Sequence, residues 1–251
     1  MTMLKLSQGD AADKIAWLAD AAASTSHGAV VGYDISGWDD SVWVLHSMYK
    51  DVESSADAPN KRPRTLLGEA TGSPVDLSTG IPLEYSPTPV EKWTRLPWSE
   101  LACRLNFELG AGMSNPPSDS WLPPALPANI LAPNEGQLNE KDLQSVVDAV
   151  KTILPETTEE CIAFFAALPA QEFDSATVYS GSLNDLQQLV RTETGHATPS
   201  NIWPIDRTWF IYTDWDLLAT KISGPVELIN AIEASPELET IRWPVKPNHM
   251  E

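Results

Sequence analysis

The sequence is poor in cysteine, and it has no long apolar run. Its two cysteines, Cys103 and Cys161, lie 58 positions apart in a chain of 251 residues. This usage is typical of reduced thiols in a cytosolic protein and not of a disulfide framework. No apolar run approaches the ~18 residues of a membrane span. Residues 1–10 also lack the apolar core of a signal peptide. The sequence therefore predicts a cytoplasmic protein with no membrane segment.

Positive charge is also scarce. The chain has 16 Lys and Arg residues against 35 Asp and Glu residues, for a formal net charge of −19. Residues 1–138 carry 17 acidic and 9 basic residues (net −8), and residues 139–251 carry 18 and 7 (net −11), so the excess is spread along the chain. Such a field repels nucleic acid and anionic lipid, and it attracts basic proteins. We expect no nucleic-acid binding and no membrane binding. A basic protein partner is one reading of the acidity, and solubility alone is the other.

The sequence patterns of several site types are missing. It contains no GxGxxG, GxxxxGK[ST] or GxSxG pattern, which would indicate phosphate binding or a serine nucleophile. The four histidines are scattered without HxH or HxxxH spacing, so no metal site is predicted. Cys161 lies in an apolar run that would bury an unreactive thiol. The sequence therefore predicts no cofactor and names no reaction.

Tryptophan is abundant, with ten in the chain, and three of them lie in residues 202–222. This stretch predicts a β-hairpin with strands at 208–213 and 217–222, because it is rich in β-branched and aromatic residues. Alternation in the first strand places Phe210 and Tyr212 on one face and Trp209 and Ile211 on the other. Both faces are apolar, so we expect each to be covered.

The polar and aromatic residues around this hairpin are the candidate site. Asp206 fits an Asx-type turn after Trp203 and Pro204. An arginine just before a buried strand commonly pairs with a carboxylate, so Arg207 is expected either to pin the hairpin to the last helix or to belong to a binding or catalytic pair. The candidate partner-binding residues are Trp203, Asp206, Arg207, Asp214, Trp215 and Asp216.

Hydrophobic periodicity predicts an α+β fold, with a mixed or mostly antiparallel sheet flanked by helices. Helices are expected at 13–23, 93–107, 139–154, 183–190 and 226–234. Further strands are expected at 29–35, 41–49, 176–180 and 239–243. Residues 54–89 are rich in Pro, Ser, Asp and Thr and predict a long loop that contains one basic cluster, at 60–64.

Residues 113–133 contain six prolines, which excludes a regular helix or a central strand. We expect an extended strap across the surface. The PxxP spacing of Pro124 and Pro127 leaves a polyproline ligand as the alternative. The predicted organisation is an N-terminal half (1–112), a Pro-rich connection (113–136) and a C-terminal half (137–251) with the hairpin, or one compact domain.

Residues 157–161 allow two interpretations. Thr157 and Glu160 have capping-box spacing, which predicts a helix at 158–167. The C-terminal third, however, resembles a group of uncharacterised actinobacterial proteins. The resemblance rests on the Trp203-Pro204-x-Asp206-Arg207-x-Trp209 motif continuing through Thr213-Asp214-x-Asp216, on the Thr-rich turn before Cys161, and on the Ser235-Pro236 ending. It implies a strand around Cys161, which Ile162, Phe164 and Phe165 also suit, and it implies no activity. We therefore expect a strand.

Acidity, aromatic display and the missing catalytic motifs together favour a binding protein. The specific hypothesis is an immunity-type inhibitor of a basic toxin or effector, since acidic residues around aromatic anchors suit basic hot spots. The alternative is a small hydrolase that uses carboxylates, with Asp206, Asp214 or Asp216 as acid or base. A neutral structural role is the third possible function. A concave pocket around these residues would favour the enzyme, and a protruding acidic patch the inhibitor.

Overall fold

A computed structural model of the chain describes residues 3–24, 33–52, 59–60, 93–110, 112–166, 176–194 and 197–243. Within these residues the helices are α1 (Gln8–Ser24), α2 (Trp98–Leu105), α3 (Glu140–Ile153), α4 (Leu186–Thr192) and α5 (Val226–Glu233), with short 3₁₀ turns at Asp119–Trp121, Pro155–Thr157 and Leu183–Asp185. The strands are β1 (Leu4–Lys5), β2 (Asp40–Leu45), β3 (Met48–Asp51), β4 (Pro59–Asn60), β5 (Trp93–Leu96), β6 (Leu126–Pro127), β7 (Ile130–Leu131), β8 (Cys161–Phe165), β9 (Thr177–Gly181), β10 (Asn201–Pro204), β11 (Phe210–Thr213), β12 (Ala219–Gly224) and β13 (Thr240–Ile241).

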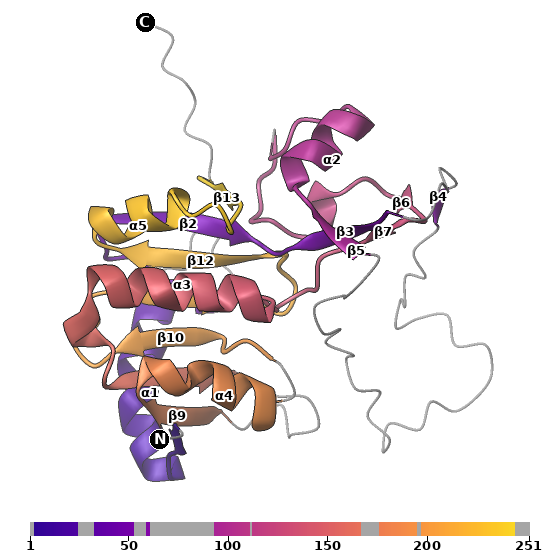
Figure 1. Cartoon of the computed structure of the whole chain (residues 1–251). Helices are drawn as coiled ribbons and strands as arrows, with labels where there is room; N and C mark the ends of the chain where they lie inside the picture. The colour runs from indigo at the N-terminus through magenta and orange to yellow at the C-terminus, as the bar shows by residue number, and fades with distance from the viewer. Residues whose placement is uncertain are drawn as a thin grey trace, which may run out of the picture.

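The main element is an eight-stranded sheet in the order β1-β9-β8-β10-β11-β12-β2-β13 (Figure 1). Every neighbouring pair in it is antiparallel. A three-stranded antiparallel sheet, β5-β3-β7, continues from the end of β2, and β4 pairs with β6. The predicted α+β class with a mostly antiparallel sheet is confirmed.

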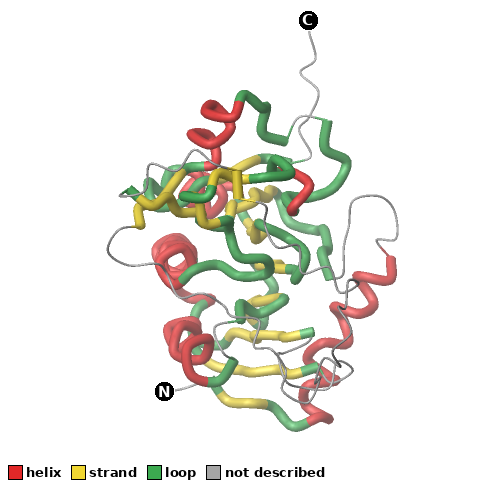
Figure 2. Tube along the Cα trace, turned by 90° about the vertical axis from the view of Figure 1, so that its right-hand side faces the viewer, coloured by secondary structure: helices red, strands yellow, loops and turns green. Residues whose placement is uncertain are grey.

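Helices α3, α4 and α5 cover one face of the large sheet, and α1 lies on the other (Figure 2). The core under α3 and α5 contains Val146, Val150, Ile229 and Ile232. Helix α3 is the helix that periodicity predicted best. Its N-cap is Asn139, whose side chain accepts a hydrogen bond from the Asp142 backbone N–H, and such a cap stabilises a helix by ~1 kcal/mol.

The second core lies on the opposite face, between the sheet, α1 and the small sheet. It includes Leu18 of α1, Trp43 and Leu45 of β2, and Trp98 and Leu101 of α2. Most of the indole rings are therefore used to cover this face. None of the helices in the described ranges has the length and apolar character that crossing a bilayer requires.

The predicted hairpin is present as β11 and β12, paired antiparallel from Phe210↔Ser223 to Thr213↔Thr220. Its two faces are also as predicted, because Trp209 and Ile211 belong to the core under the helices and Phe210 and Tyr212 to the core on the α1 side. The connection is longer than expected and covers residues 214–218.

Cys161 begins a strand, as the resemblance implied, so the capping-box helix at 158–167 is wrong. Residues 155–157 form a single 3₁₀ turn, and all five residues of β8 are buried. Burial on both faces gives a continuous apolar run, and such a run carries no period that separates a strand from a buried helix.

Two other expectations need correction. The helix predicted at 93–107 is strand β5 followed by α2, with Pro97 between them. Of the strand predicted at 29–35, residues 33–35 are turn and irregular backbone, and residues 29–32 lie outside the described residues. The predicted loop at 54–89, including the basic cluster at 60–64, also falls outside them, apart from the short strand β4.

Strands from both predicted halves share the large sheet, since β1 and β2 pair with β9 and β12. The Pro-rich region contributes β6 and β7 and no helix longer than a 3₁₀ turn in its described residues. It is attached to the end of the hairpin, because Leu218 N–H donates to the Pro117 carbonyl. The domain boundaries themselves stay a prediction.

Candidate functional site

Strand β11 separates the predicted site residues into two groups. Asp206 and Arg207 precede the strand, while Asp214, Trp215 and Asp216 follow it. A four-residue strand separates its first and last residues by about 10 Å. The structure therefore does not bring Asp206 together with Asp214 or Asp216.

Asp206 organises the turn before β11, as the Asx-type prediction required. Its Oδ1 accepts hydrogen bonds from the Thr208 backbone N–H at 3.1 Å and from the Thr208 hydroxyl at 2.6 Å. Arg207, the next residue, has a φ of 59°, a left-handed conformation that is uncommon outside glycine. The turn exposes both the Asp206 carboxylate and the Arg207 side chain.

The Arg207 guanidinium lies over the Trp17 ring, 4.3 Å from its centroid. The predicted ion pair between Arg207 and the last helix is not found among the described residues. The backbone of the same residue is also used, because its carbonyl accepts a hydrogen bond of 2.9 Å from the Trp38 indole N–H. Arg207 therefore joins the turn to α1 and to the segment before β2.

The residues after β11 form a packed turn. Asp214 is half-buried, and it accepts hydrogen bonds from the Asp216 backbone N–H at 3.2 Å and from the Tyr212 hydroxyl at 3.2 Å. Asp216 is exposed, while Trp215 is half-buried. Gly136 packs so closely here that a Cβ on it would lie 3.0 Å from the Trp215 Cα. This end of the hairpin is therefore held by the Pro-rich region.

Trp203 is buried, with only 2% of its surface exposed. Its ring packs edge-on against Trp17, with 5.4 Å between centroids, and lies 6.1 Å from Phe210. At the Asp206 end of β11, the predicted site residues with exposed side chains are therefore Asp206 and Arg207.

Several exposed carboxylates surround Asp206. The register places the start of β8, the end of β10, the start of β11, the end of β12 and the start of β2 at one edge of the sheet. We call this the acidic edge, defined by the exposed residues Asp39, Glu159, Glu160, Asp206 and Glu227.

Two large apolar side chains are exposed within the acidic edge: Ile205 is 42% exposed and Val226 is 44% exposed. Ile205 lies directly beside the acidic residues, since its backbone N–H donates to the Glu160 carbonyl. Exposed apolar groups surrounded by charge are a common composition of protein-binding surfaces.

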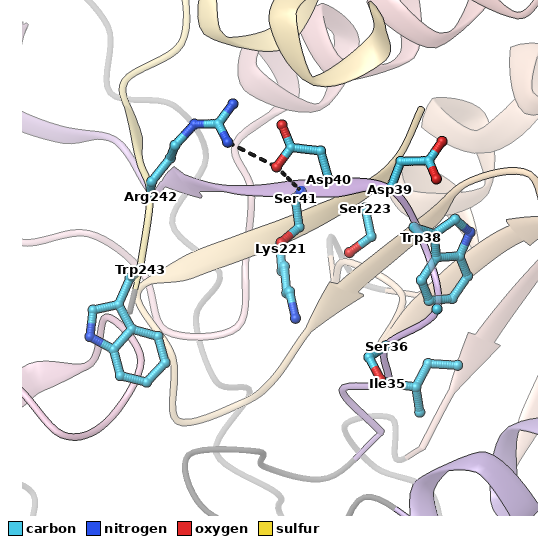
Figure 3. A pocket seen from close by; sticks show the side chains of 11 residues that line it. Ile35, Ser36, Trp38, Asp39, Asp40, Ser41, Lys221, Ser223, Arg242 and Trp243 are labelled. Carbon is cyan, nitrogen blue, oxygen red and sulfur yellow. Dashed lines mark hydrogen bonds and ion pairs between the residues drawn. The ribbon is translucent and has the colours of Figure 1, made fainter. Parts of the chain in front are cut away.

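Two hollows flank the segment 36–39 next to this edge. The first has a volume of about 450 Å³, and Figure 3 shows its lining. The second, of about 460 Å³, contains Asp206, Arg207 and Trp17 in its lining. Segment 36–39 lines both hollows.

The floor of the first hollow is the α1-side face of the sheet at β12 and β2. Ser223 and Ser41 are cross-strand partners there, and Lys221 lies two residues from Ser223 on the same face. Asp34 forms a close ion pair with Lys221, at 2.9 and 3.2 Å from Nζ to the two carboxylate oxygens. Burial raises the pKa of Asp34 despite the neighbouring ammonium group.

The rim is also charged. Arg242 donates to both carboxylate oxygens of Glu233 and to Asp40 Oδ1, each at 2.8 Å. These bonds to Glu233 and Asp40 raise the pKa of the Arg242 guanidinium, which stays protonated. Asp39 is exposed and makes no ion pair with any residue in the described ranges.

Burial shifts the pKa of two side chains of types often used in catalysis, Cys161 and His46, away from the neutral range. Burial raises the pKa of Cys161 to about 12, so the thiol stays protonated. Burial lowers the pKa of His46 to about 4, and its ring is held by the Asn134 carbonyl and the Thr220 hydroxyl. No group of three or more His, Cys, Asp or Glu residues in the described ranges could hold a metal ion.

Reasoning from sequence missed the hollow, because its residues come from three separate segments. One signal was present: Lys221 and Ser223 are polar residues on one face of β12, with the apolar Ile222 between them. A polar pair in a strand covered on both sides indicates either a buried ion pair or a cavity.

No family model, no curated protein and no solved structure matches the chain. The resemblance to the actinobacterial group therefore stays a prediction from sequence.

Proposed function

We propose that this protein is a cytoplasmic binding protein that recognises a basic protein partner through the acidic edge. The specific form of the proposal is an immunity-type inhibitor that covers a basic toxin or effector. The observation that supports it best is the meeting of Asp206 with Asp39, Glu159, Glu160 and Glu227 at one edge of the sheet.

The acidic edge has the properties that association with a basic surface requires. The charge of −19 steers a cationic partner from a distance. The exposed Ile205 and Val226 supply apolar contact area next to Asp206 and Glu227 in the chain. Arg207 lies at the same edge, and its guanidinium packs over the Trp17 ring. This contact holds the Arg207 side chain in place before a partner binds.

The alternative hydrolase gains no support from the arrangement of its carboxylates. Paired carboxyl groups in glycoside hydrolases lie ~5–9.5 Å apart, whereas β11 separates Asp206 from Asp214 and Asp216. Asp214 is also engaged by the Tyr212 hydroxyl and the Asp216 backbone. We therefore propose no catalytic role for these three residues.

The test is binding between the purified protein and the products of the genes adjacent to its own, measured by calorimetry. An edge variant combines Glu159→Gln, Glu160→Gln and Asp206→Asn. A matched control removes three exposed carboxylates elsewhere, with Glu108→Gln, Asp148→Asn and Glu193→Gln. We expect a basic neighbour to bind the wild type and the control, and to bind the edge variant at least tenfold more weakly. Equal affinity for all three proteins would reject the acidic edge as the contact surface.

Growth of a host that expresses the same neighbour separates inhibition from binding alone. If the protein is an inhibitor, the neighbour arrests growth, and co-expression of the wild type or the control restores it while the edge variant does not. A neighbour that binds at the edge but leaves growth unaffected would keep the binding function and reject the immunity-type role.

A further inference from the structure

Two serine side chains, Ser41 and Ser223, lie on the floor of the first hollow. Ser223 lines the hollow with 3% of its surface exposed, and no hydrogen bond of its hydroxyl is seen among the described residues. The close view shows this hydroxyl directed into the hollow beside Lys221 (Figure 3). Ser41, opposite Ser223 in the sheet, likewise has no side-chain hydrogen bond within the described ranges. A hydroxyl can both donate and accept a hydrogen bond, so these two groups can bond a ligand that enters the hollow.

Lys221 adds a further donor to this floor. An ammonium group has three N–H donors, and the two bonds to Asp34 leave one of them available. The Trp43 ring lies 5.9 Å from Nζ. The floor therefore presents one N–H and two hydroxyls, and each hydroxyl can donate and accept.

Two tryptophans stand on opposite sides of the hollow (Figure 3). Trp38 stacks on Phe210 with 4.9 Å between ring centroids, and its indole N–H is bonded to the Arg207 carbonyl. Trp243 packs edge-on against Trp43 and Trp121, and its indole N–H donates to the Met113 carbonyl. Both rings are fixed before any ligand binds, which lowers the entropic cost of binding.

The charges select against an ionic ligand. Asp34 and Asp40 are already paired with Lys221 and Arg242, so a cation would find only Asp39 unpaired and would meet two positive groups beside it. An added anion would meet Asp39 and the overall charge of −19. A neutral molecule with several hydroxyls satisfies both restrictions, because its hydroxyls accept from Lys221 and the serines and donate to the Asp39 carboxylate.

We propose that this hollow is a binding site for a neutral polyhydroxylated small molecule of the saccharide class. The volume of about 450 Å³ falls within the range of ~300–1,000 Å³ for small-molecule pockets. Trp38 and Trp243 contact the apolar C–H faces of the ring, and Ser41, Ser223, Lys221 and Asp39 hold its hydroxyls. The hollow shares Asp39 with the acidic edge, but Glu159, Glu160 and Asp206 do not line it, so the two proposals can be tested separately.

The experiment is saturation-transfer NMR followed by calorimetric titration of the full chain with named probes. The neutral probes are glucose, N-acetylglucosamine, ribose and maltose, while arginine serves as the cationic probe and inorganic phosphate as the anionic one. We expect at least one neutral probe to bind and neither ionic probe to compete with it. Binding of arginine or phosphate in place of every saccharide, or binding of no probe, would overturn the proposal.

Variants locate the site. Ser223→Ala is expected to weaken saccharide binding by about fivefold, which is the effect of losing one hydrogen bond, and Ser223→Val to abolish it by filling the floor. Ser41→Ala is the second variant if Ser223→Val does not fold. The matched control is Ser99→Ala, an exposed serine of α2 that does not line this hollow. An unchanged affinity in both Ser223→Ala and Ser41→Ala would place the ligand elsewhere and reject the proposal.

The same proteins separate this inference from the proposed function. The edge variant should retain saccharide binding, and Ser223→Ala should retain the basic partner. Loss of saccharide binding in the edge variant alone would contradict the assignment to this hollow.

Discussion

The indole N–H of Trp209 donates a hydrogen bond of 2.8 Å to the Thr157 hydroxyl, which joins the start of β11 to the turn before β8. Trp209 is fully buried. The Thr157 hydroxyl in turn donates a hydrogen bond to the Leu154 carbonyl at the end of α3. One tryptophan therefore connects the hairpin, the helix α3 and the strand that sequence periodicity misassigned.

Trp209→Ala should destabilise the protein by about 3–5 kcal/mol, the usual cost of truncating a buried tryptophan. Trp209→Phe should cost less, because it keeps most of the apolar volume and loses the bond to Thr157. Urea denaturation monitored by circular dichroism measures both. An alanine variant as stable as the wild type would show that Trp209 is not in the core.

His46 should make stability depend on pH. Its pKa is lowered from 6.5 to about 4 by burial, so the unfolded chain binds a proton below about pH 6.5 that the folded chain does not. A folded pKa below the unfolded one gives stability that is fully present above pH 6.5 and is lost as the pH falls towards 4. The loss from this group reaches about 3 kcal/mol at pH 4.

The measurement is the free energy of unfolding at pH 7.5, 6 and 5 for the wild type and His46→Gln. Glutamine does not titrate, so the difference between the two proteins should shrink as the pH falls. Asp34 and Asp142 act in the opposite direction, since burial raises the pKa of each, but both proteins share them. Parallel curves for the two proteins would show that folding does not lower the pKa of His46.

Gly136→Ala should destabilise the protein more than Gly112→Ala. Both glycines have a positive φ, 63° and 68°, so each substitution carries the left-handed penalty of ~1–2 kcal/mol. Gly136 alone is crowded: its Cβ would lie 3.0 Å from the Trp215 Cα, whereas nothing lies within 4 Å at Gly112. Thermal melts of the two variants separate the crowding from the conformational penalty. Equal losses would mean that the turn after β11 moves freely away from residue 136.

Local composition was sufficient for β11, because its β-branched and aromatic residues favour a strand. Alternation assigned the faces of β11 because Trp209 and Ile211 enter one core and Phe210 and Tyr212 the other. It failed at β8, where all five residues are buried and an apolar run has no diagnostic period. The resemblance to other sequences supplied what periodicity could not.

The candidate site was harder to predict, because proximity in sequence was taken as proximity in space. Asp206 and Asp214 are eight positions apart, but β11 lies between them. The neighbours of Asp206 are Glu160 and Asp39, which the antiparallel register brings to the same edge from 46 and 167 positions away. No local rule contains that register, since it depends on the order of all eight strands.

The two ends of β11 can be compared directly by removing the same charge from each. The edge pair is Glu160→Gln with Asp206→Asn, and the tip pair is Asp214→Asn with Asp216→Asn. If the basic partner docks on the acidic edge, the edge pair should slow its association several-fold at low salt. The difference from the wild type should shrink as salt screens the field, whose range is ~10 Å at 0.1 M ionic strength.

The tip pair should affect stability more than association. Asp214 accepts from the Tyr212 hydroxyl and from the Asp216 backbone, so its replacement should lower the melting temperature by a few degrees. Its association rate should stay close to that of the wild type. Stopped-flow mixing with the purified basic partner at 20 and 200 mM salt measures both rates, and thermal melts provide the control for folding. If the tip pair slows association and the edge pair does not, the contact surface lies around Trp215 and the proposal for the acidic edge is wrong.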